Sequence, residues 1–100
     1  MPEHDAAIAF ADLPPRDHTG APLRVTMLTR GGCHLCERAA VVLDEVCAQT
    51  GVAWTQADID EHPVLLAEYG DWLPVVFVDG RRHDYWQVDR ARLAEALAGR

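Results

Sequence analysis

The sequence predicts an α/β domain in which helices flank a four-stranded mixed sheet, with the element order β-α-β-α-β-β-α. Three observations predict this class. Between residues 24 and 59, a short apolar run, an amphipathic segment and a second extended run form a βαβ pattern, which places two strands in parallel. Asp79-Gly80 separates two further strand-like runs and is typical of a β-hairpin. A last segment, with leucines four residues apart, predicts a closing helix.

The sequence patterns that predict the first strand and the first helix are clear. Residues 24–29 are apolar and partly β-branched, and Gly31-Gly32 breaks them, which predicts a buried strand ending in a sharp turn. The next helix is expected to span about four turns, because apolar residues recur at spacings of three and four until Gly51 supplies a stop. The expected buried stripe consists of Leu35, Ala39, Val42, Leu43, Val46 and Thr50.

The middle of the chain predicts a second strand and a short helix. Residues 52–59 are extended in character. Asp60 is expected to cap a helix that has Pro63 in its first turn and Gly70 after its end. Proline is tolerated in that turn because the N–H it lacks would have had no partner within the helix.

The last part of the chain predicts a hairpin and a final helix. Residues 75–78 and 81–86 are expected to pair as antiparallel strands on either side of the Asp-Gly turn. Asp89 is expected to cap the final helix, with Leu93 and Leu97 on its buried side.

Composition excludes several functions. The chain has 100 residues, of which 49% are hydrophobic and 25% charged, as in an ordinary globular domain. Sixteen acidic residues against nine basic ones give a net charge of −7, so nucleic acids and anionic membranes are poor partners. All the basic residues are arginine, and the absence of lysine excludes Schiff-base chemistry.

We expect residues 1–23 to form a flexible tail and residues 24–100 to form the folded domain. The tail holds four of the six prolines and several acidic residues, without an apolar period. Residues 6–11 are its longest apolar run, and no Lys or Arg precedes them, which argues against a signal peptide or a spanning helix. A cytoplasmic location is therefore expected, where cysteines serve chemistry or metal binding more often than structure.

A Cys-x-x-Cys motif, Cys33-His34-Leu35-Cys36, stands at the junction of the first strand and the first helix. With Cys33 as the N-cap, the N–H groups of Leu35 and Cys36 have no partner within the helix and can donate to the Cys33 sulfur. These donors and the helix dipole favour the thiolate. Thiols in such positions have pKa values of roughly 3.5 to 7.5, compared with about 8.5 in a free cysteine.

The spacing of the motif suits a reversible disulfide. Cysteines three residues apart on a helical turn have their Cα atoms roughly 5 to 6 Å apart. We expect Cys33, on the exposed rim, to be the attacking sulfur and Cys36, one turn inward, to resolve the mixed disulfide. His34, when protonated, would stabilise the Cys33 thiolate further; the alternative is a solvated side chain without effect.

Haem and metal binding are other uses of such cysteines. A c-type haem site needs His directly after the second cysteine, where Glu37 stands. A zinc site would need two more ligands, and His62, His83 and Cys47 lack the paired spacing of such sites, so no metal is expected. Cys47 lies about 16 Å further along the helix and is expected to be a buried small hydrophobe.

Three segments carry a family resemblance: LTRGGCHLC at residues 28–36, DID at 58–60 and LPVVFVDG at 73–80. Together they resemble the glutaredoxin-like bacterial proteins of the thioredoxin fold, over residues 24 to about 98. The resemblance implies that the Leu73–Pro74 bond is cis and faces the cysteines, so that the Leu73 backbone pairs with an extended substrate; proline statistics alone favour a trans bond. It also implies that Arg30 serves the thiolate or a glutathione carboxylate, the alternative being an arginine on a loop rim.

Departures from the family pattern concern glutathione. Where glutaredoxins carry Gly-Gly before the Asp of the last helix, this chain has Gln87-Val88, preceded by Trp86 and followed by Asp89. Side chains at these positions screen the backbone N–H groups that would hold glutathione. Asp89 and Trp86 remain candidates for binding substrate or glutathione, Trp86 either as a rim aromatic or as the end of a strand. Glutathione is therefore expected to be a possible but poor co-substrate.

The expected function is that of an enzyme, a thiol-disulfide oxidoreductase without a bound cofactor, in which the Cys33 thiolate attacks a substrate disulfide and Cys36 resolves. Its expected partners are a protein or low-molecular-weight disulfide and a reductase or thiol that recycles the pair. Two alternatives remain open. One is an iron–sulfur cluster carrier, a role that the family resemblance allows, and the other is a redox-inactive binding module on the same fold.

Overall fold

The computed structural model describes residues 24–98, which form four strands, three α-helices and one 3₁₀ helix. They follow in the order β1 (Val25–Thr29), α2 (His34–Thr50), β2 (Trp54–Asp58), η1 (Ile59–Glu61), α3 (Pro63–Tyr69), β3 (Val75–Val78), β4 (Arg81–Tyr85) and α4 (Arg90–Ala98). The order confirms the predicted β-α-β-α-β-β-α sequence of elements, with the 3₁₀ helix η1 as an addition. The tail predicted at residues 1–23 lies outside the described residues.

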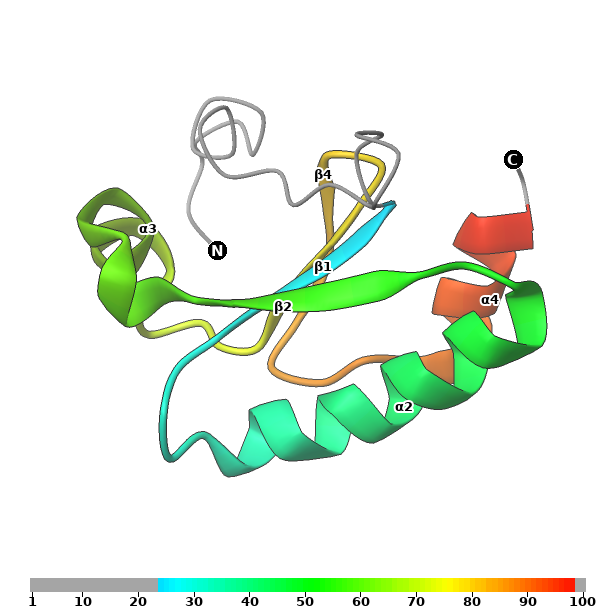
Figure 1. Ribbon diagram of the computed structural model, residues 1–100, viewed down its shortest axis with the longest axis horizontal. Coiled ribbons are helices and arrows are strands. Elements are labelled where there is room, and N and C mark those ends of the chain that lie inside the picture. Colours follow the sequence, from blue (N-terminus) through cyan, green and yellow to red (C-terminus); the bar gives the residue numbers. More distant parts are fainter. Residues whose placement is uncertain (1–23, 99–100) are drawn as a thin grey trace.

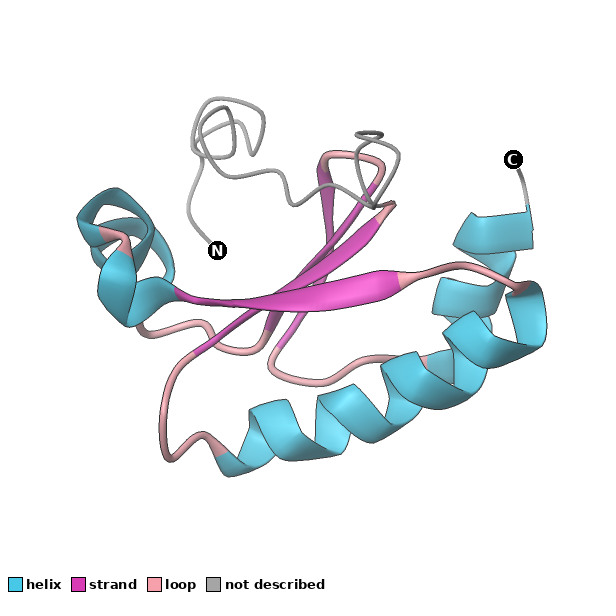
Figure 2. Cartoon of the chain, in the orientation of Figure 1, coloured by secondary structure: helices cyan, strands magenta, loops and turns pink. Residues whose placement is uncertain are grey.

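The strands form one mixed sheet in the order β2-β1-β3-β4. β1 pairs with β2 in parallel, whereas β1 with β3 and β3 with β4 are antiparallel. Figure 1 shows α2 and α4 together on one side of the sheet, and α3 at the end where β2 finishes. Figure 2 shows the strands in the middle of the domain with the helices around them. Within residues 24–98, no helix combines the length and the apolar character needed to cross a membrane.

The core lies between the sheet and its helices. The two central strands, β1 and β3, are buried along almost their whole length, as their continuous apolar runs predict. Tyr69 of α3 meets Phe77 of β3 edge to face, with 5.8 Å between the ring centroids. Leu93 and Leu97 are buried on α4, in agreement with the prediction.

The buried stripe of α2 differs from the predicted stripe. It consists of Cys36, Ala39, Leu43, Val46 and Cys47. Leu35 is 40% exposed and Thr50 is exposed, so placing these two residues in the stripe was wrong. The helix is turned so that both of its cysteines face the core, because a cysteine side chain packs as a small hydrophobe.

The turns and helix ends lie where the sequence predicts them, with the exception of one helix cap. Gly51 ends α2 in the left-handed region at φ +73°. Asp79 and Gly80 have φ values of +53° and +82°, as the two-residue hairpin turn requires. The predicted cap at Asp60 is wrong: α3 begins after His62, which makes no side-chain capping hydrogen bond. Asp60 lies instead within η1, whose cap is Asp58; Asp58 Oδ1 accepts a hydrogen bond from the N–H of Asp60 over 2.9 Å.

The strand register brings two distant loops together. Leu28, near the end of β1, lies opposite Val75, at the start of β3. Because the pair is antiparallel, the chain leaving β1 and the chain entering β3 meet at the same edge of the sheet. Residues 30–33 and residues 70–73 therefore contribute to a common cleft.

Candidate active site

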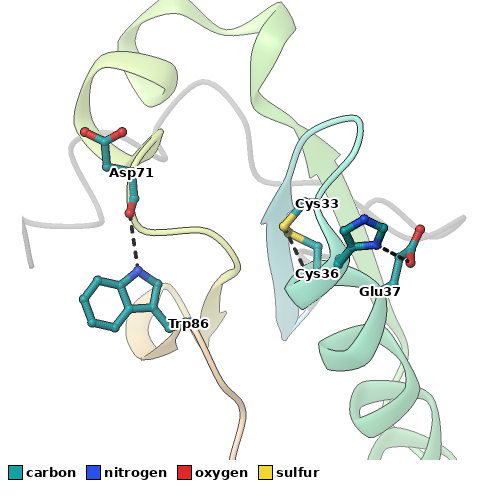
Figure 3. Close-up of a disulfide and its surroundings, with 6 residues drawn as sticks. Cys33, Cys36, Glu37, Asp71 and Trp86 are labelled. Carbon is teal, nitrogen blue, oxygen red and sulfur yellow. Dashed lines mark hydrogen bonds and ion pairs between the residues drawn. A yellow bond between two sulfur atoms is a disulfide. The ribbon is translucent and has the colours of Figure 1, made fainter.

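Cys33 and Cys36 lie where β1 gives way to α2 (Figure 3). Gly32 turns the chain with φ +78°, and Cys33 follows as the N-cap residue with an extended backbone. The two cysteines form a disulfide, and their Cα atoms are 5.2 Å apart, as the spacing predicts. At this Cα separation, the bond can form and break without rebuilding the helix.

The first turn of α2 contacts the Cys33 sulfur directly. The N–H of Cys36 donates to Cys33 Sγ over 3.1 Å. Of the two N–H groups predicted to share this role, with Leu35 as the other, the structure uses that of Cys36. Cys36 is buried, whereas Cys33 is partly exposed. This difference in exposure is what the predicted roles require, because the attacking sulfur must reach the substrate whereas the resolving sulfur only has to reach Cys33.

The two residues expected to serve the thiolate are each paired with a carboxylate. The side chain of His34 is 89% exposed, and its Nδ1 lies 3.6 Å from Glu37 Oε2, a pair drawn as a dashed line in Figure 3. Arg30 Nη2 lies 3.0 Å from Asp60 Oδ1. Arg30 nevertheless lines the clefts on both sides of Cys33.

The larger of these clefts has a volume of about 630 Å³ and opens toward β2. Both cysteines line it, together with the end of β1 and the start of α2. Its polar lining residues carry both signs of charge: Arg30 is positive and Glu37 and Asp58 are negative, with the neutral Gln56 beside them in the lining.

The smaller cleft, of about 250 Å³, lies on the other side of Cys33. Gly70, Asp71 and Leu73 form its far wall. The Leu73–Pro74 peptide bond is cis, as the resemblance implies, and it places Leu73 in this wall. The side of Cys33 that faces Leu73 is therefore open to a ligand.

Trp86 belongs to an aromatic cluster that we did not foresee from the sequence. Its indole stacks on Trp72, with 5.3 Å between centroids and 17° between planes, and both rings meet Tyr85 edge to face. The indole N–H donates to the backbone carbonyl of Asp71 over 3.3 Å (Figure 3), and the backbone N–H of Trp86 donates to the carbonyl of Pro74 over 2.9 Å. Trp86 therefore holds the loop that forms the wall of the smaller cleft.

The predicted pairing of the two hairpin strands could have indicated this cluster. The paired strands place Val75 opposite Tyr85, so the residues just before β3 and just after β4 meet. Trp72 and Trp86 occupy those two flanks. Extending the strand pairing by a few residues would have predicted their contact.

Asp89 lies at the start of α4, where it forms the predicted cap. Its Oδ1 accepts a hydrogen bond from the N–H of Arg92 over 3.0 Å. The N–H of Asp89 itself donates to Asp84 Oδ2 over 3.1 Å, and the same Asp84 oxygen lies 3.5 Å from Arg92 Nη1. A carboxylate thus already occupies a backbone donor that an anionic ligand would need at this helix start.

The third cysteine is separate from the site. Cys47 is 2% exposed, and burial raises the pKa of its thiol to about 11, with the charge of Asp44 adding to the effect. At neutral pH this thiol is protonated and packed, in agreement with its expected place in the core. Across residues 24–98, His, Cys, Asp and Glu side chains do not gather in groups of three that could hold a metal ion.

Comparisons with known proteins agree with this geometry. The model of the glutaredoxin-like domain family (DUF836) matches residues 24–98. An uncharacterized protein of Mycobacterium tuberculosis is 44% identical over 80 residues, which cover 75% of this chain and 82% of that protein. A structural genomics target from X. campestris is 30% identical, with a TM-score of 0.63 over 76% of this chain and 97% of that chain.

The fold is also that of more distant structures. A mutant thioredoxin of Halobacterium salinarum aligns with a TM-score of 0.54 and 24% identity, over 75% of this chain and 71% of that chain. At this level of identity the likeness concerns the fold alone. The four-stranded mixed sheet with three α-helices over residues 24–98 is thus a thioredoxin-type fold with a cysteine pair at its first helix.

Proposed function

Since the chain belongs to the glutaredoxin-like domain family (DUF836), we propose that it is a thiol-disulfide oxidoreductase. The observation that carries the proposal is the Cys33–Cys36 disulfide at the start of α2, with the N–H of Cys36 3.1 Å from Cys33 Sγ. Such a donor stabilises a thiolate more than a thiol, because hydrogen bonds to a charged acceptor are stronger. The thiolate is the nucleophile in disulfide exchange.

The reaction has two exchange steps and a recycling step. In the reduced protein, the Cys33 thiolate attacks one sulfur of a substrate R–S–S–R′; the substrate bond breaks, R′S⁻ leaves and takes up a proton, and a mixed disulfide joins Cys33 to R–S. Cys36 then loses its proton and attacks the Cys33 sulfur, which releases RS⁻ to be protonated. Two electrons have passed to the substrate. A dithiol or two monothiols then reduce the Cys33–Cys36 pair again.

The smaller cleft is the proposed place of the substrate. The backbone of Leu73, held by the cis bond to Pro74, would pair with an extended substrate chain and bring its sulfur against Cys33. Arg30 would turn from Asp60 toward the thiolate or a substrate carboxylate. His34 would assist only when protonated and turned away from Glu37.

Glutathione is proposed to be a poor electron donor, and the start of α4 supports this view. The Asp84 carboxylate accepts from the N–H of Asp89, so a glutathione carboxylate approaching that helix end meets a like charge. The side chains of Gln87 and Val88 add to the obstruction. A dithiol donor does not need this helix start. We place the enzyme in the cytoplasm, whose reducing conditions favour the active dithiol.

The test supplies two donors separately to the full chain. Reduction of bis(2-hydroxyethyl) disulfide is followed with a dithiol donor and, in a second assay, with glutathione and its reductase. We expect turnover with the dithiol, loss of turnover in Cys33→Ser, and wild-type rates in the matched variant Cys47→Ala. No turnover with either donor would contradict the proposal and favour a binding module.

A further inference from the structure

We propose that the substrates are polypeptide disulfides that carry a Lys or Arg beside the reacting cysteine. The basic side chain would bind an acidic aromatic surface, which we define as Asp71, Trp72, Asp84, Tyr85 and Trp86. The inference rests on the proposed function for the reaction itself and adds the class of substrate.

The backbone of Trp86 is the first observation. Its φ is +62°, in the left-handed region that bulky residues rarely adopt. Such strain persists only where the surroundings impose it, and it clusters at functional sites. Here two hydrogen bonds, to the carbonyls of Pro74 and Asp71, and the stack on Trp72 hold the residue in place. The residue is nevertheless 47% exposed, so the strain serves a surface position and not the core.

The second observation connects this surface to the reacting sulfur. Asp71 accepts the indole N–H of Trp86 and also lines the smaller cleft with Cys33 and Leu73. Figure 3 shows Asp71 and Trp86 across from the disulfide. A polypeptide that extends from Cys33 past Leu73 and Asp71 would thus come to the aromatic surface.

A third cleft lies within the acidic aromatic surface. It has a volume of about 390 Å³ and is lined by Asp84, Tyr85, Trp86 and Gln87. An open cleft lined by two aromatic side chains suits a long side chain with a charged end. A small disulfide bound at Cys33 would not extend into it.

The negative charge of the acidic aromatic surface favours a positively charged substrate side chain. Aromatic faces attract cations, and the exposed carboxylate of Asp71 adds to this attraction, whereas Asp84 is already paired with Arg92 of α4. The chain as a whole carries a net charge of −7. Its own residues 1–23 include four acidic residues and a single arginine, so repulsion disfavours that segment as the occupant. A basic substrate segment is the complementary choice.

The test measures kcat/KM for three peptide disulfides that differ only in the residue next to the cysteine, which is Lys, Ser or Glu. A dithiol recycles the enzyme, and bis(2-hydroxyethyl) disulfide is measured in parallel. For the wild type we expect the Lys peptide to exceed the Glu peptide by roughly three- to tenfold, through KM and not kcat. The ratio should fall as salt is added.

Variants assign the preference to the surface. Trp86→Ala should bring the Lys-to-Glu ratio toward one, Trp86→Phe should keep part of it because a ring remains, and Asp71→Asn should lower it because one charge is lost. Trp54→Ala is the matched control, since Trp54 lies on β2, at the opposite edge of the sheet from β4. It should keep the wild-type ratio.

A binding measurement separates this inference from the proposed function. In Trp54→Phe, the remaining indoles of the chain are Trp72 and Trp86, and their fluorescence should change on titration with a peptide in which Ser replaces the cysteine and Lys stands beside it. If the enzyme reduces the small disulfide but has the same kcat/KM for all three peptides, the inference is overturned and the proposed function stands. The same holds if the Lys-to-Glu ratio of kcat/KM is unchanged in Trp86→Ala. Absence of all turnover would overturn the proposed function, and the inference would then be decided by whether the Lys peptide binds more tightly than the Glu peptide.

Discussion

The backbone N–H of Cys36 donates to the sulfur of Cys33 over 3.1 Å, so a cysteine sulfur takes the place that an oxygen usually holds at the start of a helix. The donor belongs to the same turn as the acceptor and therefore stays close to Cys33 when the disulfide opens. The nucleophile is thus supported by local backbone geometry.

The first prediction is that the Cys33 thiol of the reduced protein has a pKa below the ordinary value of about 8.5. The measurement is the rate of iodoacetamide labelling against pH, resolved by residue with mass spectrometry. Cys47 serves as an internal control, because burial raises the pKa of its thiol to about 11 and it should stay unlabelled in the native protein. A labelling midpoint of about 8.5 for Cys33 would contradict the prediction.

The second prediction concerns the order of attack. Cys36→Ser should accumulate a mixed disulfide between Cys33 and the substrate, because the resolving sulfur is missing. Cys33→Ser should trap none, since Cys36 is buried beneath the first turn. Non-reducing electrophoresis and mass spectrometry count the adducts. Equal trapping by the two variants, or more by Cys33→Ser, would reverse the assigned roles.

The third prediction is a loss of stability at alkaline pH that depends on Cys47. In the unfolded chain a cysteine has its ordinary pKa of about 8.5, whereas burial raises the pKa of Cys47 to about 11 in the fold. Between these values the unfolded state releases a proton that the folded state keeps, so the free energy of unfolding falls as pH rises. The loss should be on the order of 1 kcal/mol by pH 10.

Urea unfolding at pH 8, 9 and 10 measures this loss. A Cys33→Ser/Cys36→Ser background leaves Cys47 as the single cysteine of the chain and prevents disulfide exchange. Addition of Cys47→Ala should lower stability at pH 8 through the lost packing, but it should flatten the dependence on pH. The same slope with and without Cys47 would show that its ionisation does not contribute.

The fourth prediction concerns glutathione. Gln87→Gly/Val88→Gly should raise the glutathione-dependent rate, because smaller residues uncover the backbone before Asp89. Adding Asp84→Asn should raise it further, by about fivefold, because removal of one like charge near 4 Å is worth on the order of 1 kcal/mol in water. The dithiol-dependent rate serves as the reference. Efficient glutathione turnover by the unmodified chain, without any gain from these changes, would refute the explanation.

Much of the fold follows from local signals in the sequence. The Val75–Val78 run, the Asp79-Gly80 turn and the Asp89 cap each depend on the residues next to them, so their prediction needed no knowledge of the whole molecule. The motif at Cys33 was predictable for the same reason, because it combines a turn with a helix start.

The errors arose where two neighbouring patterns were both possible. On α2, Leu35 and Cys36 both stand at helical spacing from Ala39, and burial of Cys36 beside the sheet decided the phase. At the end of β2, the pairing of β2 stops at Asp58, which caps η1; Asp60 lies inside this added turn, and α3 begins only after His62. These choices depend on tertiary packing, which spacing along the chain does not contain.

The walls of the site were the least predictable part. The stack of Trp72 on Trp86 joins residues on either side of a hairpin, and the bond from the N–H of Asp89 to Asp84 depends on how β4 leaves the sheet. The register of β3 and β4 shifts between Val76 and Phe77, which a simple alternating pattern does not indicate.

The residues that react with a disulfide and the residues that select the substrate lie on different segments of the chain. The reacting groups lie within residues 33–36, at a helix start stabilised by its own backbone, whereas residues 70–73 form the far wall of the smaller cleft and residues 84–87 line the cleft of the aromatic surface. Loops of this kind can be exchanged without touching the sulfur chemistry, provided that the bond from Trp86 N–H to the Pro74 carbonyl is kept. The domain is therefore a modular scaffold, and new substrate preferences could be grafted onto it by replacing two short segments while retaining one nucleophile.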